Sequence, residues 1–398
     1  MFKPVKPLGM VEFTVLLAFM ISILAMSTDA MLPALSDIAE DLELSNRNDA
    51  QLVVSAMFLG FAIGQIVAGP LSDCYGRKPV IYLGYIIFIG GCLISIITES
   101  FTLMLVGRVL QGLGAAAPRI VGIALVRDEY EGRAMARIMS LVMAIFILVP
   151  AIAPAIGQAI LLAADWRSIF VVLLLVAVVA FIWFATRQPE TLDQIDRRIF
   201  SFTGLWQGVV EAFSYRSLSG YTCASGMIFG AFLGYLSSAQ QVFQVTYDTG
   251  QWFSLYFGTA ALAIGAASIF NSRVVMRLGM RYLTLRALIG VTAASVLFLG
   301  PVFAFAGVPP LWSFMIWLLV IFFGMGILFG NFNTLAMEPV GHMAGLGAAV
   351  HGSISTVLAL PLGWAIGKLF DATVIPLVLG FAILGACALI VMWYTERV

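Results

Sequence analysis

Four ionisable side chains lie inside long apolar stretches of the sequence: Asp29, Arg108, Arg119 and His351. A charge within a membrane costs about 3 kcal/mol on insertion scales, so each one is a candidate for ion or proton handling. Asp29 is the only clear acid among them, and its carboxyl could carry a proton. His351 has suitable acid–base chemistry, although a lone histidine on a helix more often packs through a hydrogen bond.

Arg108 and Arg119 are eleven residues apart, about three helical turns, so one helix face would carry both, with Gln111 close to it. Counting the rise of each helix places Asp29 and Arg108 at a comparable depth in the outer part of the membrane, where they could pair. A carboxyl that alternates between a dry surrounding and an arginine neighbour could bind and release a proton. Asp29 and Arg108 are therefore the predicted proton-coupling residues. The alternative for Asp29 is a static cap or ion pair.

Methionine and aromatic side chains crowd several apolar stretches and could line an adaptable cavity. Two prolines in one stretch would kink its helix and could border a pathway. The predicted lining of a substrate cavity is Met26, Gln111, Arg119, Met143, Phe146, Pro150, Pro154, Phe232, Tyr235, Tyr256 and His351. Packing or lipid contact is the alternative for any one of them.

The densest motif is GPLSDCYGRKPV, residues 69–80, which breaks an otherwise apolar sequence with glycines and charges. Pro70 predicts a turn, so we expect a short loop between two helices. A weak echo, NSRVVMRLGMRYL, follows at residues 271–283; aligning Gly279 with Gly76 puts Arg281 opposite Lys78 and Met276 opposite Asp73. This echo indicates a duplicated chain.

Composition determines which elements can position these residues. The chain has 398 residues, 61% hydrophobic and 11% charged, against roughly 25% charged in soluble domains. Its apolar blocks have the length that spans a bilayer, which predicts an all-α polytopic membrane protein. The twelve predicted spans are 11–32, 50–70, 79–98, 101–126, 138–163, 167–186, 219–243, 252–270, 282–305, 311–336, 344–366 and 373–394.

Lysine and arginine gather in alternate inter-span segments, which places both termini in the cytoplasm. The other segments hold little beyond Arg47, Arg167 and Lys368. Lys3 and Lys6 precede a first block that is too long for a signal-peptide core, so we expect an uncleaved span. The longest polar interruption predicts two six-helix bundles, 1–186 and 219–398, joined by a cytoplasmic linker, 187–218.

Several function classes lack support. A formal net charge of zero gives no nucleic-acid footprint, and the four cysteines show neither metal spacing nor a disulfide framework. The sequence contains neither a GxxxxGK[ST] phosphate loop nor a HExxH metal motif. We therefore expect neither an enzyme nor ATP-driven machinery, and no cofactor or metal.

The chain resembles the major facilitator superfamily, whose motif after the second span is matched by Gly69, Leu71, Asp73, Gly76, Arg77 and Lys78, with Cys74 where many members carry arginine. Arg108, Gln111 and Gly112 look like the RxxQGxG element of the fourth span. The segments 27–33 and 124–128 are similar to drug:proton antiporters of the Bcr/CflA type, whereas the span-five signature at 150–157 matches only loosely.

This resemblance implies a gate made of Gly69, Asp73, Gly76, Arg77, Lys78 and Asp128. In it, Asp73 would contact a helix end in the second half, and Arg77 would pair with Asp128. The implied function is export of amphipathic drugs in exchange for protons, by a monomer in the lipid of a bacterial inner membrane, with the proton gradient as energy source. A proton-coupled nutrient or metabolite symporter is the alternative, and a non-transporting membrane sensor is a more distant one.

Overall fold

The computed structural model describes residues 8–197 and 202–397, which leaves Lys3, Lys6 and Arg198 of the charge pattern outside the described residues. Within these ranges the chain is helical and contains no strand. The α-helices are α1 (Met10–Asp29), α2 (Leu35–Asp41), α3 (Leu52–Tyr75), α4 (Arg77–Ile97), α5 (Phe101–Glu129), α6 (Gly132–Leu161), α7 (Arg167–Arg187), α8 (Phe202–Ser214), α9 (Arg216–Gln241), α10 (Phe253–Leu278), α11 (Met280–Ala304), α12 (Leu311–Met337), α13 (Ala344–Lys368) and α14 (Ile375–Glu396).

Short helical segments fill several connections: η1 (Leu32–Ala34), η2 (Arg47–Gln51), η3 (Gln194–Asp196), the π-helix η4 (Val242–Thr246), η5 (Gly250–Trp252) and η6 (Glu338–Met343). Twelve of the helical segments in the described chain are long and apolar enough to cross a membrane. The predicted class, an all-α membrane protein with twelve spans, is confirmed.

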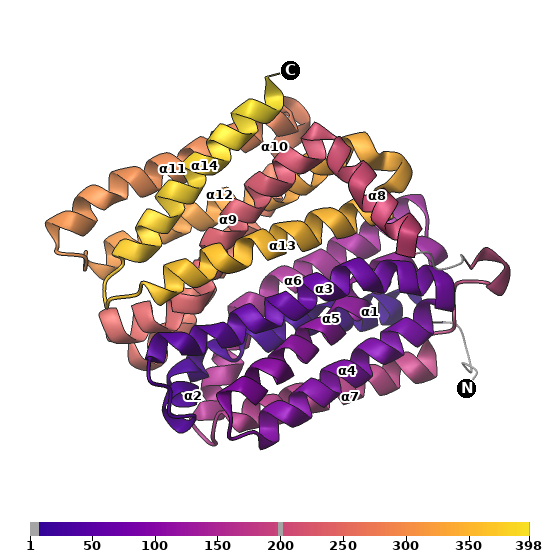
Figure 1. Ribbon diagram of the computed structural model, residues 1–398, viewed down its shortest axis with the longest axis horizontal. Helices are drawn as coiled ribbons and strands as arrows, with labels where there is room; N and C mark the ends of the chain where they lie inside the picture. The colour runs from indigo at the N-terminus through magenta and orange to yellow at the C-terminus, as the bar shows by residue number, and fades with distance from the viewer. Residues whose placement is uncertain (1–7, 198–201, 398) are drawn as a thin grey trace. The chain divides into compact units, whose positions relative to one another are not determined.

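The helices form two compact units, residues 1–31 with 56–207, and residues 32–55 with 208–398. In the first unit α1 packs against α5, α6 and α7, and α4 packs against α5 and α7. In the second, α9 packs against α12, α13 and α14, while α11 contacts α12 and α14 (Figure 1). Residues 32–55, which the sequence assigns to the first bundle, group with the second unit because η1 contacts α9 and η2 contacts α13.

Small residues set how closely neighbouring helices approach. A Cβ on Gly60 would overlap the Val109 carbonyl, and one on Gly112 would overlap the Met57 carbonyl, so α3 and α5 are in backbone contact. Lipid tails are as apolar as the helix surfaces, so burial of apolar area does not drive helices together in a membrane. Close van der Waals packing at small residues stabilises their association instead.

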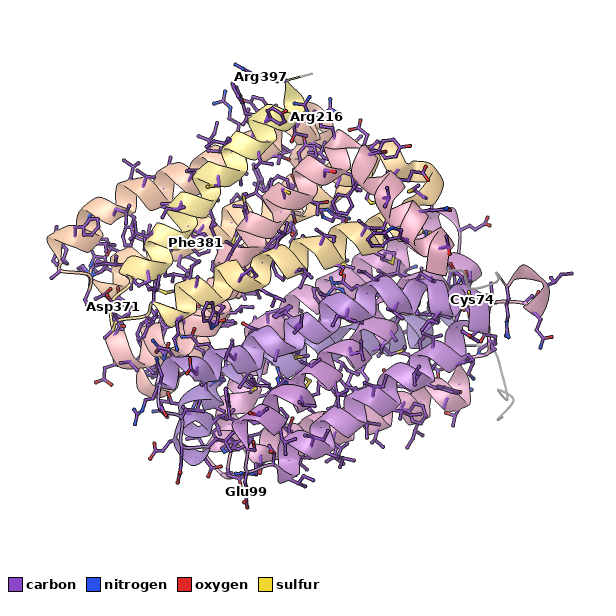
Figure 2. The ribbon with its side chains drawn as sticks, in the orientation of Figure 1. Cys74, Glu99, Arg216, Asp371, Phe381 and Arg397 are labelled. Atoms are coloured by element: carbon purple, nitrogen blue, oxygen red, sulfur yellow. The ribbon has the colours of Figure 1, made fainter. Side chains whose placement is uncertain are left out.

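The loop predicted at residues 69–80 is a single residue. α3 runs through Pro70 to Tyr75 and α4 begins at Arg77, so only Gly76 is non-helical. Gly76 has φ 103°, a conformation that glycine adopts without the steric penalty of a Cβ. Figure 2 shows Cys74, next to this turn, and Glu99 at opposite ends of the first unit. Arg216 and Arg397 likewise lie at one end of the second unit and Asp371 at the other.

Candidate functional site

A buried polar cluster surrounds Arg108 in the first unit, where its side chain is 0% exposed. One guanidinium nitrogen, Nη1, donates to Gln111 Oε1 at 2.5 Å and to Ser27 Oγ at 3.1 Å. The other, Nη2, donates to the Ser27 carbonyl at 3.1 Å and to Met57 Sδ at 2.9 Å. The close approach of α3 at Gly112 brings Met57 within reach. Three helices therefore hold the guanidinium in one place.

Gln111 extends this cluster toward α4. Its Nε2 lies 3.3 Å from Ser95 Oγ and 3.6 Å from Cys92 Sγ, and its Oε1 also accepts from Ser27 Oγ at 3.3 Å. The sequence groups Gln111 with a substrate cavity, and in the structure its Oε1 accepts a hydrogen bond from Arg108. Contacts of this kind fix a charged side chain before any ligand arrives.

Asp29 is the last residue of α1 and is 5% exposed. Its carboxyl forms neither a hydrogen bond nor an ion pair with a described residue, Arg108 included. The direct pair that depth alone allowed is therefore absent from this structure. Asp29 and Arg108 are connected instead through the backbone, because the carbonyl of Ser27, two residues before Asp29, accepts from Arg108.

The proline-containing helix α6 meets α1 beside Asp29. α6 is one helix from Gly132 to Leu161, and Pro150 and Pro154 both lie inside it. A Cβ on Gly157 would overlap the carbonyl oxygen of Ala30, so the backbones touch at the residue that follows Asp29. A change in the bend of α6 would therefore displace the end of α1.

Arg119 lies further along α5 and is half-buried between two rings. Its guanidinium carbon is 4.9 Å from the ring centre of Phe146 and 5.5 Å from that of Phe61. The two methionine candidates of the first unit differ in exposure, since Met26 is half-buried and Met143 is exposed. The structure therefore brings Arg119 and Phe146 together, as cation and aromatic face.

The remaining cavity candidates lie in the second unit. Phe232 and Tyr235 both pack on Phe322, with ring centres 5.8 and 4.8 Å away. Tyr256 stacks on Phe243 at 5.7 Å, and contacts through Phe253 and Phe257 connect this pair to Tyr235.

His351 Nδ1 lies 2.9 Å from Thr222 Oγ1 and the side chain is 5% exposed. This is the hydrogen-bonded packing arrangement that the sequence left open as the alternative to proton handling.

The residues of the predicted gate gather at one end of the first unit, and Gly69 precedes them on the last turns of α3. Arg77 Nε donates to Asp128 Oδ2 at 2.9 Å, the pair that the family resemblance implies. Arg77 Nη1 donates to Asp73 Oδ1 at 2.5 Å and to Ser72 Oγ at 2.8 Å. Lys78 Nζ donates to the carbonyl of Gln188 at 2.5 Å, just past α7.

Glu190 completes this network, and the sequence did not single it out. Its two carboxylate oxygens accept the backbone N–H groups of Arg77 and Lys78 at 2.9 and 3.0 Å. These are the first N–H groups of α4, and an anion is favoured at a helix N-terminus. Glu190 follows Pro189 in the predicted linker. The sequence of a linker does not show which groups a carboxylate in it will contact.

No group of three or more His, Cys, Asp and Glu side chains in the described chain is placed to hold a metal ion. The family profile described as Major Facilitator Superfamily matches residues 16–360. The chain belongs to this superfamily.

Curated relatives align over most of their length. An uncharacterized MFS-type transporter, YdgK of Bacillus subtilis, is 30% identical over 91% of this chain and 90% of its own. Multidrug resistance protein D of Escherichia coli is 26% identical over 87% and 86%. A bicyclomycin resistance protein homolog of Haemophilus influenzae is 26% identical over 91% and 89%. The resemblance to the Bcr/CflA type is thus confirmed, and the relatives are transporters rather than enzymes.

The architecture also matches a solved transporter. A D-xylose–proton symporter superposes with a TM-score of 0.78 at 13% identity, covering 96% of this chain and 97% of that one. At this identity the likeness establishes the fold. The family match and the twelve apolar helices of the described residues show that the chain is a multi-pass membrane transporter of this superfamily.

Proposed function

We propose that this transporter exports amphipathic drugs or similar small molecules in exchange for protons. The observation that carries the proposal is Asp29, a buried carboxyl without a fixed partner, two residues from a backbone carbonyl that Arg108 holds. Two relatives carry multidrug or bicyclomycin resistance in their names. A buried acid within a membrane span is a functional residue by default.

In the proposed cycle Asp29 takes up a proton from outside as the substrate leaves, and releases it inward. Arg108 is fixed by Ser27, Gln111 and Met57, so its charge acts on Asp29 from a constant position. Protonation would neutralise a carboxylate that lies buried without a partner and would change how the end of α1 packs. The contact between Gly157 and Ala30 would pass this change to α6, which Pro150 and Pro154 allow to bend.

The remaining elements of the proposal follow from the helix count and the charge pattern. We place the chain in a bacterial inner membrane with both termini cytoplasmic, acting as a monomer on a proton gradient without a cofactor. The two bundles would alternate access to the substrate by rocking. The gate of Asp73, Arg77 and Asp128 would bias this equilibrium toward the state in which its ion pairs form.

One observation favours the symporter as a second candidate. Arg119 contacts aromatic faces and forms no ion pair with a residue that the structure describes. A guanidinium in this position would suit an anionic metabolite. Uptake of substrate in the same direction as the proton would distinguish this candidate from export.

The test uses inverted membrane vesicles with an imposed pH gradient and a panel of phenicols, fluoroquinolones and lipophilic cations. We expect gradient-dependent accumulation by the wild-type protein and its loss in Asp29→Asn. Glu99→Gln is the matched control, because Glu99 is an exposed acid in the connection between α4 and α5 (Figure 2). Accumulation that persists in Asp29→Asn, or a gradient effect lost equally in both variants, would refute the proposal.

A further inference from the structure

Four arginines lie around the one-residue turn between α10 and α11 in the second unit: Arg273, Arg277, Arg281 and Arg286. All four residues are exposed. The sequence contains no aspartate or glutamate from residue 249 to residue 337, a stretch that includes all of α10 and α11. The two helices therefore carry positive charge beside their turn and no acid of their own.

Among the described residues, acids from other helices pair with one of these four arginines. Arg281 contacts Glu338 at 3.0 Å and Glu396 at 3.6 Å, so it takes the acids that approach from the ends of α12 and α14. The other three, Arg273, Arg277 and Arg286, form no ion pair with a described residue, and we call them the arginine cluster. Their charge is available to a group outside the chain.

The corresponding turn of the first unit is arranged in the opposite way. Arg77 follows Gly76, is 8% exposed, and pairs with both Asp73 and Asp128. Its charge is therefore satisfied within the chain. The exposed, uncompensated cations beside α10 and α11 are thus not a necessary consequence of this kind of turn.

The arginine cluster lies at the end of two membrane spans. Arg273 is six residues before Gly279 and Arg286 is seven residues after it, so both lie about 10 Å from the turn along their helices. The guanidinium carbon of Arg286 is 5.1 Å from the ring centre of Tyr282, which lies one helical turn nearer the start of α11. The side chain of Arg286 therefore extends toward the end of the span, as arginines do when they reach for lipid head groups.

The cluster also continues the exposed apolar surfaces of both helices. Large exposed apolar side chains flank it, among them Ile269, Phe270 and Met276 on α10, and Leu285, Ile289 and Val296 on α11. The two helices contact each other, and each also packs on α12. In a membrane, exposed apolar side chains of this kind contact lipid tails. A lipid lying on these helices would bring its head group to the arginines.

We propose that the arginine cluster binds the phosphate of an anionic phospholipid, such as phosphatidylglycerol. The guanidinium groups would donate charge-assisted hydrogen bonds to the phosphate oxygens, while the tails lie along the apolar side chains of α10 and α11. Charge complementarity favours an anionic lipid over a zwitterionic one, whose head group carries its own cation. The inference depends on the chain spanning a membrane, and neither Asp29 nor the direction of transport enters it.

The experiment measures lipid binding to the purified full-length transporter by native mass spectrometry in detergent. Phosphatidylglycerol is the probe, and phosphatidylcholine with the same acyl chains is the zwitterionic comparison. We expect phosphatidylglycerol to bind about tenfold more tightly or better, because each arginine beside an anionic lipid contributes about fivefold. Glycerol 3-phosphate, which has the phosphate without the tails, should not bind at the same concentrations. Equal binding of the two lipids, or binding of glycerol 3-phosphate as tight as that of phosphatidylglycerol, would overturn the proposal.

Variants locate the site. Changing all three arginines of the cluster to glutamine should abolish the preference for phosphatidylglycerol, and changing all three to lysine should retain most of it, because lysine keeps the charge. Thermal unfolding of each variant checks that the fold is intact. A preference that survives in the triple glutamine variant would refute the assignment.

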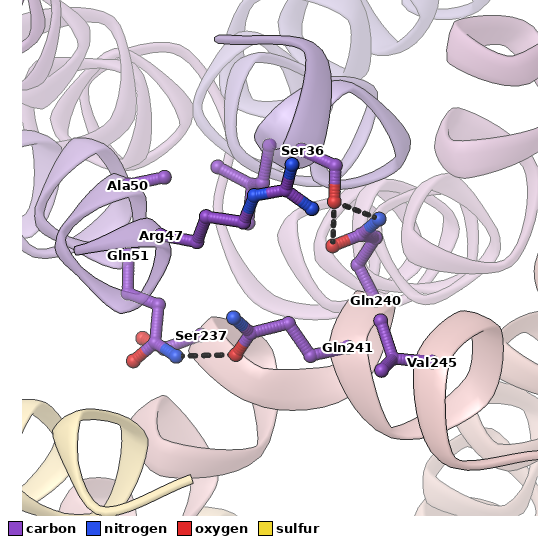
Figure 3. Close-up of a pocket in the computed structure, with 9 residues that line it drawn as sticks. Ser36, Arg47, Ala50, Gln51, Ser237, Gln240, Gln241 and Val245 are labelled. Atoms are coloured by element: carbon purple, nitrogen blue, oxygen red, sulfur yellow. Dashed lines mark hydrogen bonds between the residues drawn. The ribbon is translucent and has the colours of Figure 1, made fainter. Parts of the chain in front are cut away.

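Single substitutions supply a matched control. Arg273→Gln should weaken phosphatidylglycerol binding about fivefold, whereas Arg47→Gln should leave it unchanged. Arg47 is also exposed, and Figure 3 shows it extending from η2 beside a small pocket that no described residue of α10 or α11 lines. An equal loss of binding in Arg47→Gln and Arg273→Gln would show that the lipid responds to the charge of the whole protein and not to the arginine cluster.

Discussion

The two halves of the chain contain the same one-residue turn with very different surroundings. Gly76 (φ 103°) precedes α4 and Gly279 (φ 82°) precedes α11. The N–H of each glycine donates to the carbonyl four residues earlier, at 3.1 and 2.9 Å. In the first unit Arg77 follows the turn, with only 9% of its side chain exposed, whereas in the second unit the side chain of Arg281 is 58% exposed.

Each turn also lies beside an ion pair, although the cations do not correspond, since Met280 stands opposite Arg77 and Arg281 opposite Lys78. Arg77 pairs with Asp128 near the end of α5, and Arg281 pairs with Glu338 just after α12, at 3.0 Å. Both halves therefore have the same backbone turn, while only the first buries the cation of its ion pair. Buried charge pairs are costly to break and exposed ones contribute little. We infer that the first turn is the one that matters for transport, and five substitutions test this difference.

The largest effect is expected for Arg77→Met, which gives the first turn the residue that the second turn carries as Met280. It would leave Asp128 half-buried without its cation, lowering the free energy of unfolding by about 2 kcal/mol or more. Chemical denaturation in detergent measures the loss, and vesicle uptake should fall with it. Arg133→Met, at an exposed arginine at the start of α6, is the control. Equal stability of the two variants would contradict the comparison.

Alanine at the two glycines should separate the turns next. Both positions have positive φ in a region that only glycine readily adopts, so each alanine costs about 1–3 kcal/mol. At Gly76 the new Cβ would also lie 2.7 Å from Glu190 Oε2, whereas at Gly279 nothing lies within 4 Å. Unfolding temperatures should therefore fall further for Gly76→Ala than for Gly279→Ala. A larger fall in unfolding temperature for Gly279→Ala would show that the side chains around Gly76 move aside at little energetic cost.

Glu190→Gln should have an intermediate effect, about 1 kcal/mol, because the amide keeps one acceptor for the α4 N-terminus but loses the charge. Asp193→Asn, at another acid of the same connection whose side chain caps no backbone group, serves as the control. Thermal unfolding at low salt measures both. If Asp193→Asn lost as much stability, Glu190 would have no specific role.

The smallest effect is expected for Arg281→Met. Its pairs with Glu338 and Glu396 are exposed, and such pairs contribute about 1 kcal/mol or less. The loss should shrink further as salt is raised, because screening weakens exposed charges. Stability and transport measured across a salt series check this. A loss of stability and transport as large as that of Arg77→Met would show that the two turns do not differ in importance.

The fold could be predicted because lipid imposes a simple rule on sequence. Every span needs a long apolar helix, so length and hydropathy indicated twelve of them. The turn at Gly76 was harder to anticipate. Pro70 suggested a loop, but α3 continues through it, since packing in a membrane helix tolerates a lost hydrogen bond.

The candidate residues of the site could be predicted because charged side chains are rare inside membrane spans and therefore stand out in the sequence. Arg108 and Gln111 could be placed on one face by helical spacing, and they are in contact. That Arg108 bonds to the Ser27 backbone rather than to Asp29 depends on how α1 and α5 pack, which spacing does not specify. Glu190 was missed for the same reason, because its partners are backbone N–H groups with no signature in the sequence.

Proton release on substrate binding tests the coupling role of Asp29 most directly. The purified transporter, in weakly buffered detergent with a pH indicator, is mixed with a substrate identified in the vesicle panel. We expect the wild-type protein and Glu99→Gln to release protons, and Asp29→Asn to bind the substrate without releasing any. Undiminished release from Asp29→Asn would contradict the account, because the exchanged proton would then reside on another group.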